Sequence, residues 1–210
     1  MSDELTRYKV GNIIHFGGYD WRVLKVHNGK ALVLSDKVID NRRYHHTEEK
    51  TTWDKCELRN YLNKEFYFKF SPQDKKLIVE TKITTNNNPW YDTDGGSEVN
   101  DKIFLLSIEE VIKYFGDSGD LENRKSWYWD DNESIVKEGA DGGYLNDKYN
   151  NERIAKNKKG MPAWWWLRSL GSSKHRIARV RDNGIICVHG SVTRGLSDSG
   201  GIRPALWLNL

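Results

Sequence analysis

The chain of 210 residues contains only two cysteines, Cys56 and Cys187. Two cysteines are too few for a disulfide framework, so we expect two reduced thiols. The longest uninterrupted apolar run, Ala163–Leu167, is far shorter than the roughly 20 residues that a membrane-spanning helix needs. The opening MSDELTRYKVGN has no apolar segment of the secretory type, which predicts a cytoplasmic protein or a component of a phage particle.

Metal-binding patterns are also scarce. His45 and His46 are adjacent, so on a strand they would point to opposite faces and chelate one ion poorly. Asp92 and Asp94 resemble the start of a calcium loop, but Ile103 stands at the twelfth position, where the loop needs Glu. The sequence therefore predicts no metal, no cofactor and no catalytic residues.

Positive charge is concentrated in the C-terminal part of the chain. Residues 153–210 carry 11 lysines and arginines against two acids, Asp182 and Asp198, whereas the preceding part is net acidic. Such a basic half indicates an acidic partner, which is a nucleic acid, an anionic glycan or an acidic protein surface. The alternative is a solvated face that compensates the acidic half.

The N-terminal part has the pattern of an antiparallel meander. Val10–Phe16, Trp21–Val26 and Ala31–Ser35 are short segments rich in β-branched and aromatic residues. Gly17-Gly18 and Asn28-Gly29 lie between them and favour tight turns. We expect three consecutive paired strands.

Three helices are predicted from apolar spacing and from capping residues. Ser71 before Pro72 is a typical N-cap followed by proline in the first turn, with Leu77 and Ile78 facing inward. Ser107 and Glu110 have the spacing of a capping box. The helices are Leu58–Phe66, Ser71 to about Glu80, and Ser107 to about Phe115.

Strands and loops separate these helices. Thr81–Thr85 and Asp101–Leu106 are predicted strands, and Asn86–Asn100 is a polar loop whose Trp90 and Tyr91 are either a lid on the core or binding contacts. Residues 121–160 have the composition of a long loop excursion. The length suits a single domain over residues 1–210.

The C-terminal stretch Trp164–Leu210 is predicted to form the central sheet. Trp164 and Trp166 alternate along a strand, so they share one face and are expected in the core. Later in this stretch, Asn183-Gly184 separates two alternating segments and predicts a hairpin with a two-residue type I′ turn.

The hairpin register follows from that turn. A two-residue loop pairs Val180 with Cys187 and places both with Ala178 on the core face. Arg179 and Arg181 then point outward with Ile186 and Val188. Cys187 is expected to be buried and unreactive, and not to pair with Cys56.

The residues WWWLRS, the Asn-Gly hairpin and GGIRPALWL resemble the C-terminal signature of a bacterial and phage domain of unknown function. That domain is similar to the formylglycine-generating-enzyme branch of the C-type-lectin fold. Three upstream blocks agree in order: FGGYDWRVLKVHNGKALVLS, TWDKCELRNYLNKEFYFKFSPQDKKLI and DKIFLLSIEEVIKYF. The resemblance implies an α+β, C-type-lectin-like domain with two to three helices on a small, twisted antiparallel sheet and termini close together.

The resemblance also bears on function. In related proteins varied by diversity-generating retroelements, the C-terminal strands and loops carry hypervariable ligand contacts, and the matching stretch here is Ser172–Ser199. The enzymatic relatives bind copper through two cysteines in the C-terminal core, where this chain has only Cys187. Trp129-Asp130-Asp131-Asn132 only faintly resembles the calcium motif of lectins.

We therefore predict a non-catalytic ligand-binding module that recognises a protein or an anionic surface, as in phage receptor recognition or bacterial adhesion. Arginine suits this role because it binds carboxylate and phosphate through two parallel hydrogen bonds. The predicted contact residues are Lys174, His175, Arg176, Arg179, Arg181, His189, Ser191, Arg194, Ser197 and Asp198.

Two alternatives remain open at this point. One is an oxidase of the formylglycine-generating type, which requires Cys56 and Cys187 to meet at one metal. The other is nucleic-acid binding through the basic half, which predicts a steep loss of affinity with salt. Arg168 and Arg203 flank the apolar strands and are expected to form structural ion pairs rather than ligand contacts.

Overall fold

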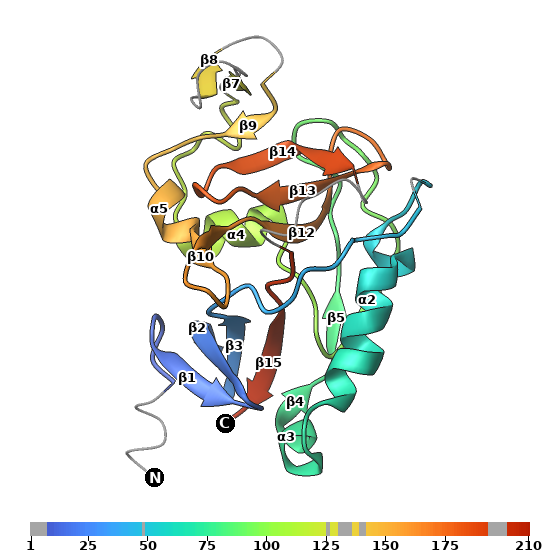
Figure 1. The fold of residues 1–210 in the computed structure, drawn as a ribbon, viewed down its shortest axis with the longest axis vertical. Helices are drawn as coiled ribbons and strands as arrows, with labels where there is room; N and C mark the ends of the chain where they lie inside the picture. Colours follow the sequence, from blue (N-terminus) through green and yellow to red (C-terminus); the bar gives the residue numbers. More distant parts are fainter. Residues whose placement is uncertain (1–7, 48, 125–126, 130–135, 139–141, 193–200) are drawn as a thin grey trace.

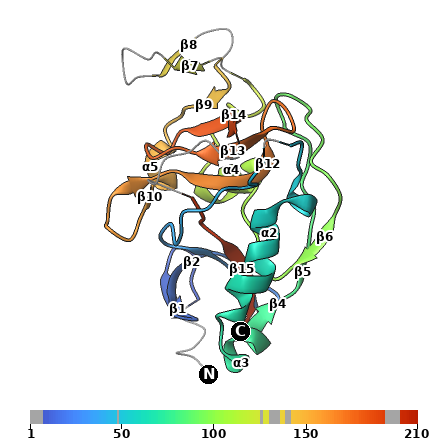
Figure 2. The ribbon, with the colours of Figure 1, turned by 45° about the vertical axis from the view of Figure 1, so that its right-hand side comes forward.

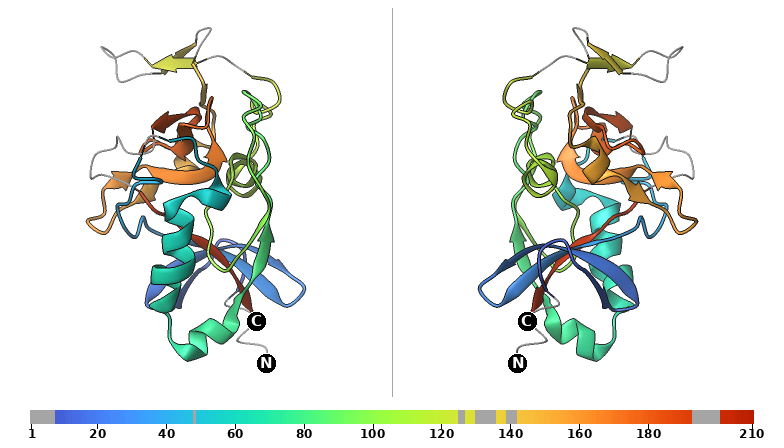
Figure 3. Two further views of the ribbon diagram at one scale, coloured as in Figure 1. Left: turned by 90° about the vertical axis from the view of Figure 1, so that its right-hand side faces the viewer. Right: turned by 90° about the vertical axis from the view of Figure 1, so that its left-hand side faces the viewer.

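The computed structural model describes residues 8–47, 49–124, 127–129, 136–138, 142–192 and 201–210. Two antiparallel sheets lie one above the other along the long axis of the molecule, and a helical column runs beside them (Figure 1). In the side views, the chain from β5, Thr81–Ile83, onward connects the end of the molecule that holds the lower sheet to the end that holds the upper sheet (Figure 3). The architecture is α+β.

The lower sheet has five strands in the order β1-β2-β3-β15-β4. The predicted meander is confirmed, and its second turn, Asn28-Gly29, has φ values of 49° and 67° and joins the paired residues His27 and Lys30. This turn is of the I′ type, with positive φ at both central residues. The strands are β1 Ile13–Phe16, β2 Tyr19–His27, β3 Lys30–Ser35, β15 Ala205–Asn209 and β4 Ile78–Val79.

The upper sheet has four strands in the order β12-β13-β14-β9. The predicted hairpin strands are confirmed, but the C-terminal stretch is divided between two sheets, because β15 pairs with β3 and β4 of the lower one. The expectation of one central sheet was therefore wrong. The strands are β12 Trp165–Leu170, β13 Arg176–Val180, β14 Ile186–Val192 and β9 Tyr144–Leu145.

The helical column beside the sheets is the predicted helix over 58–66 (Figure 2). It begins as α2, Glu57–Tyr61, and continues with π-helical bonding as η2, Leu62–Phe66. A short 3₁₀ turn, η1 over Trp53–Lys55, precedes it. Arg59 ties the column to β6, Val99–Asp101, through a 2.7 Å bond from Nε to the buried carboxylate of Asp101.

The two shorter predicted helices are also present. Ser71 caps α3, Pro72–Leu77, but this helix ends earlier than expected because Ile78 begins β4, and Leu77 is exposed rather than inward. The Ser107–Glu110 capping box is formed at α4, Ile108–Phe115. The remaining short elements are β5 Thr81–Ile83, β7 Trp127–Trp129, β8 Val136–Glu138, α5 Asn150–Arg153, β10 Ala155–Lys156 and β11 Pro162–Ala163.

The described residues between 142 and 160 pack into the fold. β9 pairs with β14, and the side chain of Arg153 in α5 is fully buried. Its Nη2 bonds to Asp147 Oδ2 at 2.8 Å and to the carbonyl oxygen of Gly116 at 3.2 Å. The second half of the stretch predicted as an excursion thus joins the upper sheet to the end of α4.

The two arginines that flank the apolar strands differ. Arg168 forms the expected structural ion pair, with Glu110 of α4. Arg203 instead bonds to the backbone oxygens of Ser35 at 2.9 Å and Asp36 at 3.4 Å, and lies over the Trp165 ring. Its complete burial lowers its pKa to about 9. The ion-pair prediction was wrong for Arg203, because its guanidinium is enclosed by carbonyl groups and aromatic rings.

No helix among the described residues is long and apolar enough to span a membrane.

Candidate binding site

The turn of the C-terminal hairpin has one more residue than predicted. Arg181 and Ile185 are joined by a 2.8 Å backbone bond, so Asp182-Asn183-Gly184 is a three-residue loop, and only Gly184 has positive φ, at 82°. Gly184 packs so tightly on α5 that an added Cβ would lie 1.8 Å from the Asn150 carbonyl oxygen. The loop is therefore longer where the turn contacts a distant segment. The β2–β3 turn has the same Asn-Gly dipeptide and only two residues.

The extra residue changes which side chains share a face. Val180 pairs with Ile186, and Arg179 pairs with Cys187, so the predicted grouping of Val180 with Cys187 was wrong. Since directly paired residues point to the same side, one row runs Trp166–Arg179–Cys187–Tyr144 across the sheet.

Next to this row lie Trp164 and Arg181, which are two residues along the chain from Trp166 and Arg179 and just beyond the ends of β12 and β13. The predicted shared face of Trp164 and Trp166 is confirmed: both are buried, with ring centroids 4.9 Å apart. Trp165 points to the opposite side, where its ring meets Phe115 of α4 at 6.3 Å. We call the residues Trp164, Arg179, Arg181, Cys187 and Tyr144 the Arg179 face.

Arg179 is the central polar group of this face. Its side chain is partly buried rather than fully outward as predicted, and its guanidinium lies 5.5 Å from the Trp164 ring centroid. Among the described residues it has no carboxylate partner, and its Nε is a buried donor without an acceptor. The Trp164 Nε1 is a second buried donor without an acceptor.

The electrostatics of the Arg179 face favour an added negative charge. Burial lowers the pKa of Arg179, and the neighbouring positive charge of Arg181 lowers it further, against the opposing effects of Cys187, Tyr144 and Asp182. Arg181 lies 5.7 Å from the Tyr144 ring centroid, and its charge is near enough to Arg179 to lower the pKa of Arg179. An anion placed here would offset both effects.

A second group of predicted contact residues lies at the other end of the hairpin. Lys174 forms a 2.8 Å ion pair with Asp94, and Arg176 donates to the Gly190 carbonyl oxygen at 3.2 Å. His189 is half-buried with its ring 6.5 Å from Tyr91, and burial together with Arg176 lowers its pKa.

The other predicted contact residues complete the comparison. His175 is exposed beside this second group, and Ser191 lies opposite Ile177 in the hairpin. Arg194, Ser197 and Asp198 lie outside the described residues. The structure therefore brings Arg179 and Arg181 together and places Lys174, Arg176 and His189 elsewhere.

Tyr144 and Trp164 were missed as site residues. The sequence predicted that Trp164 lies in the core. It did not predict that the indole lies beside the guanidinium of Arg179, because that contact depends on the pairing of β12 with β13. Tyr144 belongs to a two-residue strand, which is too short to give an alternating pattern. The loop aromatics Trp90 and Tyr91 are partly buried against the core, and the guanidinium of Arg124 lies 4.9 Å from each ring, which favours the lid interpretation.

The two cysteines have separate surroundings. Both are buried and free. Cys56 Sγ caps α2 by accepting from Arg59 N at 3.4 Å, and burial raises its pKa to about 12. Burial also raises the pKa of Cys187, which is buried as predicted but on the arginine side rather than with Ala178.

Another polar cluster lies near the start of α2, where the buried His45 Nδ1 has no hydrogen bond among the described residues. His45 and His46 both approach Glu57, and no group of three metal-ligating side chains suited to an ion occurs within the described ranges. A pocket of about 390 Å³ beside them holds charges of both signs. There Arg42 stacks 3.6 Å from the Tyr61 ring centroid and pairs with Asp40, so these charges are already compensated.

The fold is an α+β domain whose upper sheet carries, on one face, two neighbouring arginines beside the aromatic rings of Trp164 and Tyr144. The chain belongs to DUF6273, a family of domains of unknown function, whose sequence profile matches residues 28–210. No curated protein and no solved structure matches it significantly.

Proposed function

We propose that this chain is a non-catalytic binding module that recognises a carboxylate or phosphate group of a protein or an anionic surface through the Arg179 face. The observation that carries the proposal is the guanidinium of Arg179, which is partly buried and positively charged yet has no acceptor among the described residues. Desolvating a charge without a partner is costly, and an incoming anion would remove that cost.

The surroundings of Arg179 suit recognition. Only its Nε is a fully buried unpaired donor, which leaves the Nη groups for a planar, two-point contact with an oxyanion. Trp164 and Tyr144 are rigid rings that limit the orientation of the guanidinium groups. Aromatic residues beside arginine are the composition typical of binding hot spots.

The chemistry of the thiols supports a non-catalytic role. The thiolate, not the thiol, is the nucleophile and the copper ligand, and burial favours the protonated form of both cysteines. Cys56 is also committed to the first turn of α2. An oxidase of the formylglycine-generating type would need both sulfurs at one metal.

We further propose that the fold is C-type-lectin-like. Antiparallel sheets, one long helical column and α4 agree with it, and the first and last described strands, β1 and β15, belong to the same sheet. In that framework Arg179 and Arg181 fall within Ser172–Ser199, the stretch that corresponds to the variable surface of retroelement-diversified proteins. Phage receptor recognition or adhesion is the biological setting that we propose.

The proposal is tested by calorimetric titration of the protein with sodium phosphate and with a glutamate-rich peptide. We expect Arg179→Gln to weaken binding by roughly tenfold or more, since a charged hydrogen-bonded contact is worth about 1.5–3 kcal/mol. Arg22→Gln is the matched control, because Arg22 is a partly exposed arginine that pairs with Asp36 in the lower sheet. Equal losses in both variants, or none in either, would contradict the proposal.

A further inference from the structure

A second pocket is lined by residues of the lower sheet and of β5. The lower sheet lies below the β13–β14 hairpin along the long axis of the molecule (Figure 1). It has a volume of about 350 Å³, within the range of sites for small molecules. Its lining residues come from the β2–β3 turn, from the chain around β4 and β5, and from β15, and they are His27, Asn28, Lys30, Val79, Glu80, Thr81, Lys82 and Trp207.

The floor of this pocket is apolar. Trp207 in β15 pairs with Val79 on one side and with Leu32 on the other, so these three side chains form one row on the same face of the sheet. The indole is only partly buried, whereas Leu32 beside it is fully covered. The flat Trp207 ring is therefore partly accessible to solvent, next to side chains that are fully buried.

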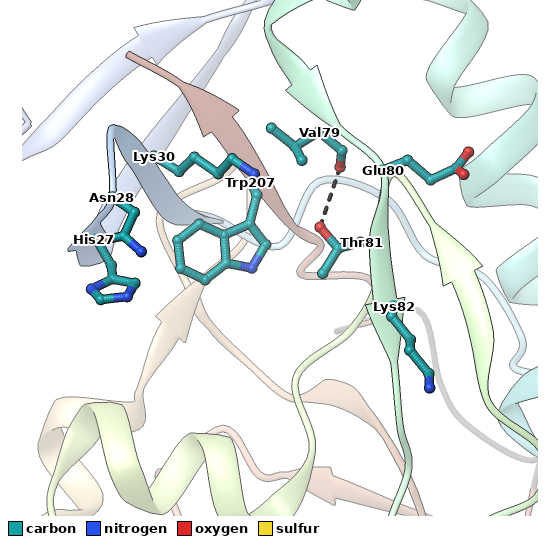
Figure 4. A pocket seen from close by; sticks show the side chains of 8 residues that line it. All are labelled: His27, Asn28, Lys30, Val79, Glu80, Thr81, Lys82 and Trp207. Atoms are coloured by element: carbon teal, nitrogen blue, oxygen red, sulfur yellow. Dashed lines mark hydrogen bonds between the residues drawn. The ribbon is translucent and has the colours of Figure 1, made fainter.

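Six of the eight lining residues are polar, and the charged ones among them are Lys30, Glu80 and Lys82. In Figure 4, Lys30 extends beside the indole, whereas the carboxylate of Glu80 and the ammonium of Lys82 point away from it. Lys82 is already paired with Glu98 at 2.6 Å. Across the described residues, Lys30 has no ion pair and the Trp207 Nε1 has no hydrogen bond, so both groups remain available as donors beside the apolar floor.

We propose that this pocket binds a small planar aromatic acid, with its ring stacked on Trp207 and its carboxylate on Lys30. A flat ring matches the open indole, since offset stacking adds to simple area burial. One negative charge matches the single unpaired ammonium.

The test uses 2-naphthoate as the probe and 2-naphthalenemethanol as its uncharged counterpart, with dissociation constants measured by ligand-observed NMR on the full chain. We expect naphthoate to bind in the micromolar to millimolar range and the alcohol to bind several-fold more weakly. Lys30→Gln should remove most of that difference, whereas Lys82→Gln should change naphthoate binding by less than about twofold, because Lys82 points away.

The role of the indole is tested by Trp207→Ala, which should weaken naphthoate binding by about tenfold or more, as expected for the loss of one stacking partner. Since Trp207 also packs on Leu32, Trp207→Phe serves as the variant that keeps a ring, and it should retain most of the affinity. Unchanged binding in folded Trp207→Ala, or no binding by the wild-type chain at millimolar probe, overturns the proposal. Trp207→Ala should leave the binding of sodium phosphate to the Arg179 face unchanged, and this result separates the pocket from the site of the proposed function.

Discussion

At the scale of single residues, Trp166 contacts several segments that are distant in the sequence. The Trp166 indole donates to the Arg42 carbonyl oxygen at 3.0 Å and packs on Tyr44 and Trp164. It thereby holds the segment after β3 against β12.

Replacing Trp166 with alanine should lower the free energy of unfolding by about 3–5 kcal/mol, because the side chain is almost completely buried and would leave a cavity. Urea denaturation measures this loss. Phe68→Ala is the matched control, since Phe68 is 70% exposed and its removal should cost less than about 1 kcal/mol. A loss below about 1 kcal/mol in Trp166→Ala would show that the run is not part of the core.

Cys56 predicts a pH dependence of stability. Its pKa rises from 9.0 to about 12 on folding, chiefly because the thiol is buried. The folded chain therefore holds this proton more tightly, so the contribution is complete below pH 9 and is lost as the pH rises toward 12.

The stability difference between the wild type and Cys56→Ala should accordingly shrink between pH 9 and about 12 and stay constant between pH 6 and 8. Denaturation at a series of pH values measures it. Thiol labelling at pH 8 should be slow for both cysteines and fast in urea. Rapid labelling of the native chain, or a difference that does not vary above pH 9, would contradict the assignment.

At the scale of elements, the two Asn-Gly turns separate what sequence determines from what packing determines. Asn28-Gly29 forms the two-residue turn that its sequence predicts, and a Cβ at Gly29 would meet nothing within 4 Å. Asn183-Gly184 forms a longer loop, because Gly184 sits against α5.

Gly184→Ala should therefore destabilise the chain more than Gly29→Ala. Both substitutions place alanine at positive φ, which costs about 1–2 kcal/mol, and only Gly184→Ala adds a collision with the Asn150 backbone. Thermal and urea unfolding of the two variants provide the comparison. Equal losses would mean that the contact between the turn and α5 is not tight.

The same reasoning explains how much of the fold followed from the sequence. The meander, the helix over 58–66 and the α4 capping box were predictable, because their causes are neighbours in the chain. The register of Arg179 and Cys187 was not, because it depends on a turn held by Asn150. The position of β15 between β3 and β4 joins segments more than 120 residues apart, which no local pattern encodes.

The candidate site followed the sequence only in part. The basic C-terminal stretch predicted contact residues on the β13–β14 hairpin, but Lys174 is engaged with Asp94 and Arg176 with a backbone carbonyl. The surroundings of Arg179 depend on how the strands of the upper sheet pair. The same pairing brings Trp164 and Tyr144 close to the two arginines.

At the scale of the whole molecule, the distribution of charge separates anion recognition from nucleic-acid binding. If the Arg179 face holds one oxyanion, binding of a DNA duplex of about 20 base pairs should be weak and its dependence on salt shallow, because few phosphates are engaged. Fluorescence anisotropy at several salt concentrations gives this slope. A steep slope equivalent to six or more phosphates would favour a nucleic-acid-binding function instead.

The triple variant of Arg179, Arg181 and Arg194 to alanine should stay folded and lose the anionic partner.

The central claim is that the Arg179 guanidinium, which has no carboxylate partner within the described ranges, binds an anion. NMR of arginine side chains tests this claim most directly. In a titration of ¹⁵N-labelled protein with sodium phosphate, the Nε–H resonance of Arg179, assigned with Arg179→Gln, should shift and saturate. The resonance of Arg168, already paired with Glu110, should not move. An Arg179 resonance that stays unchanged while the chain remains folded would contradict the account.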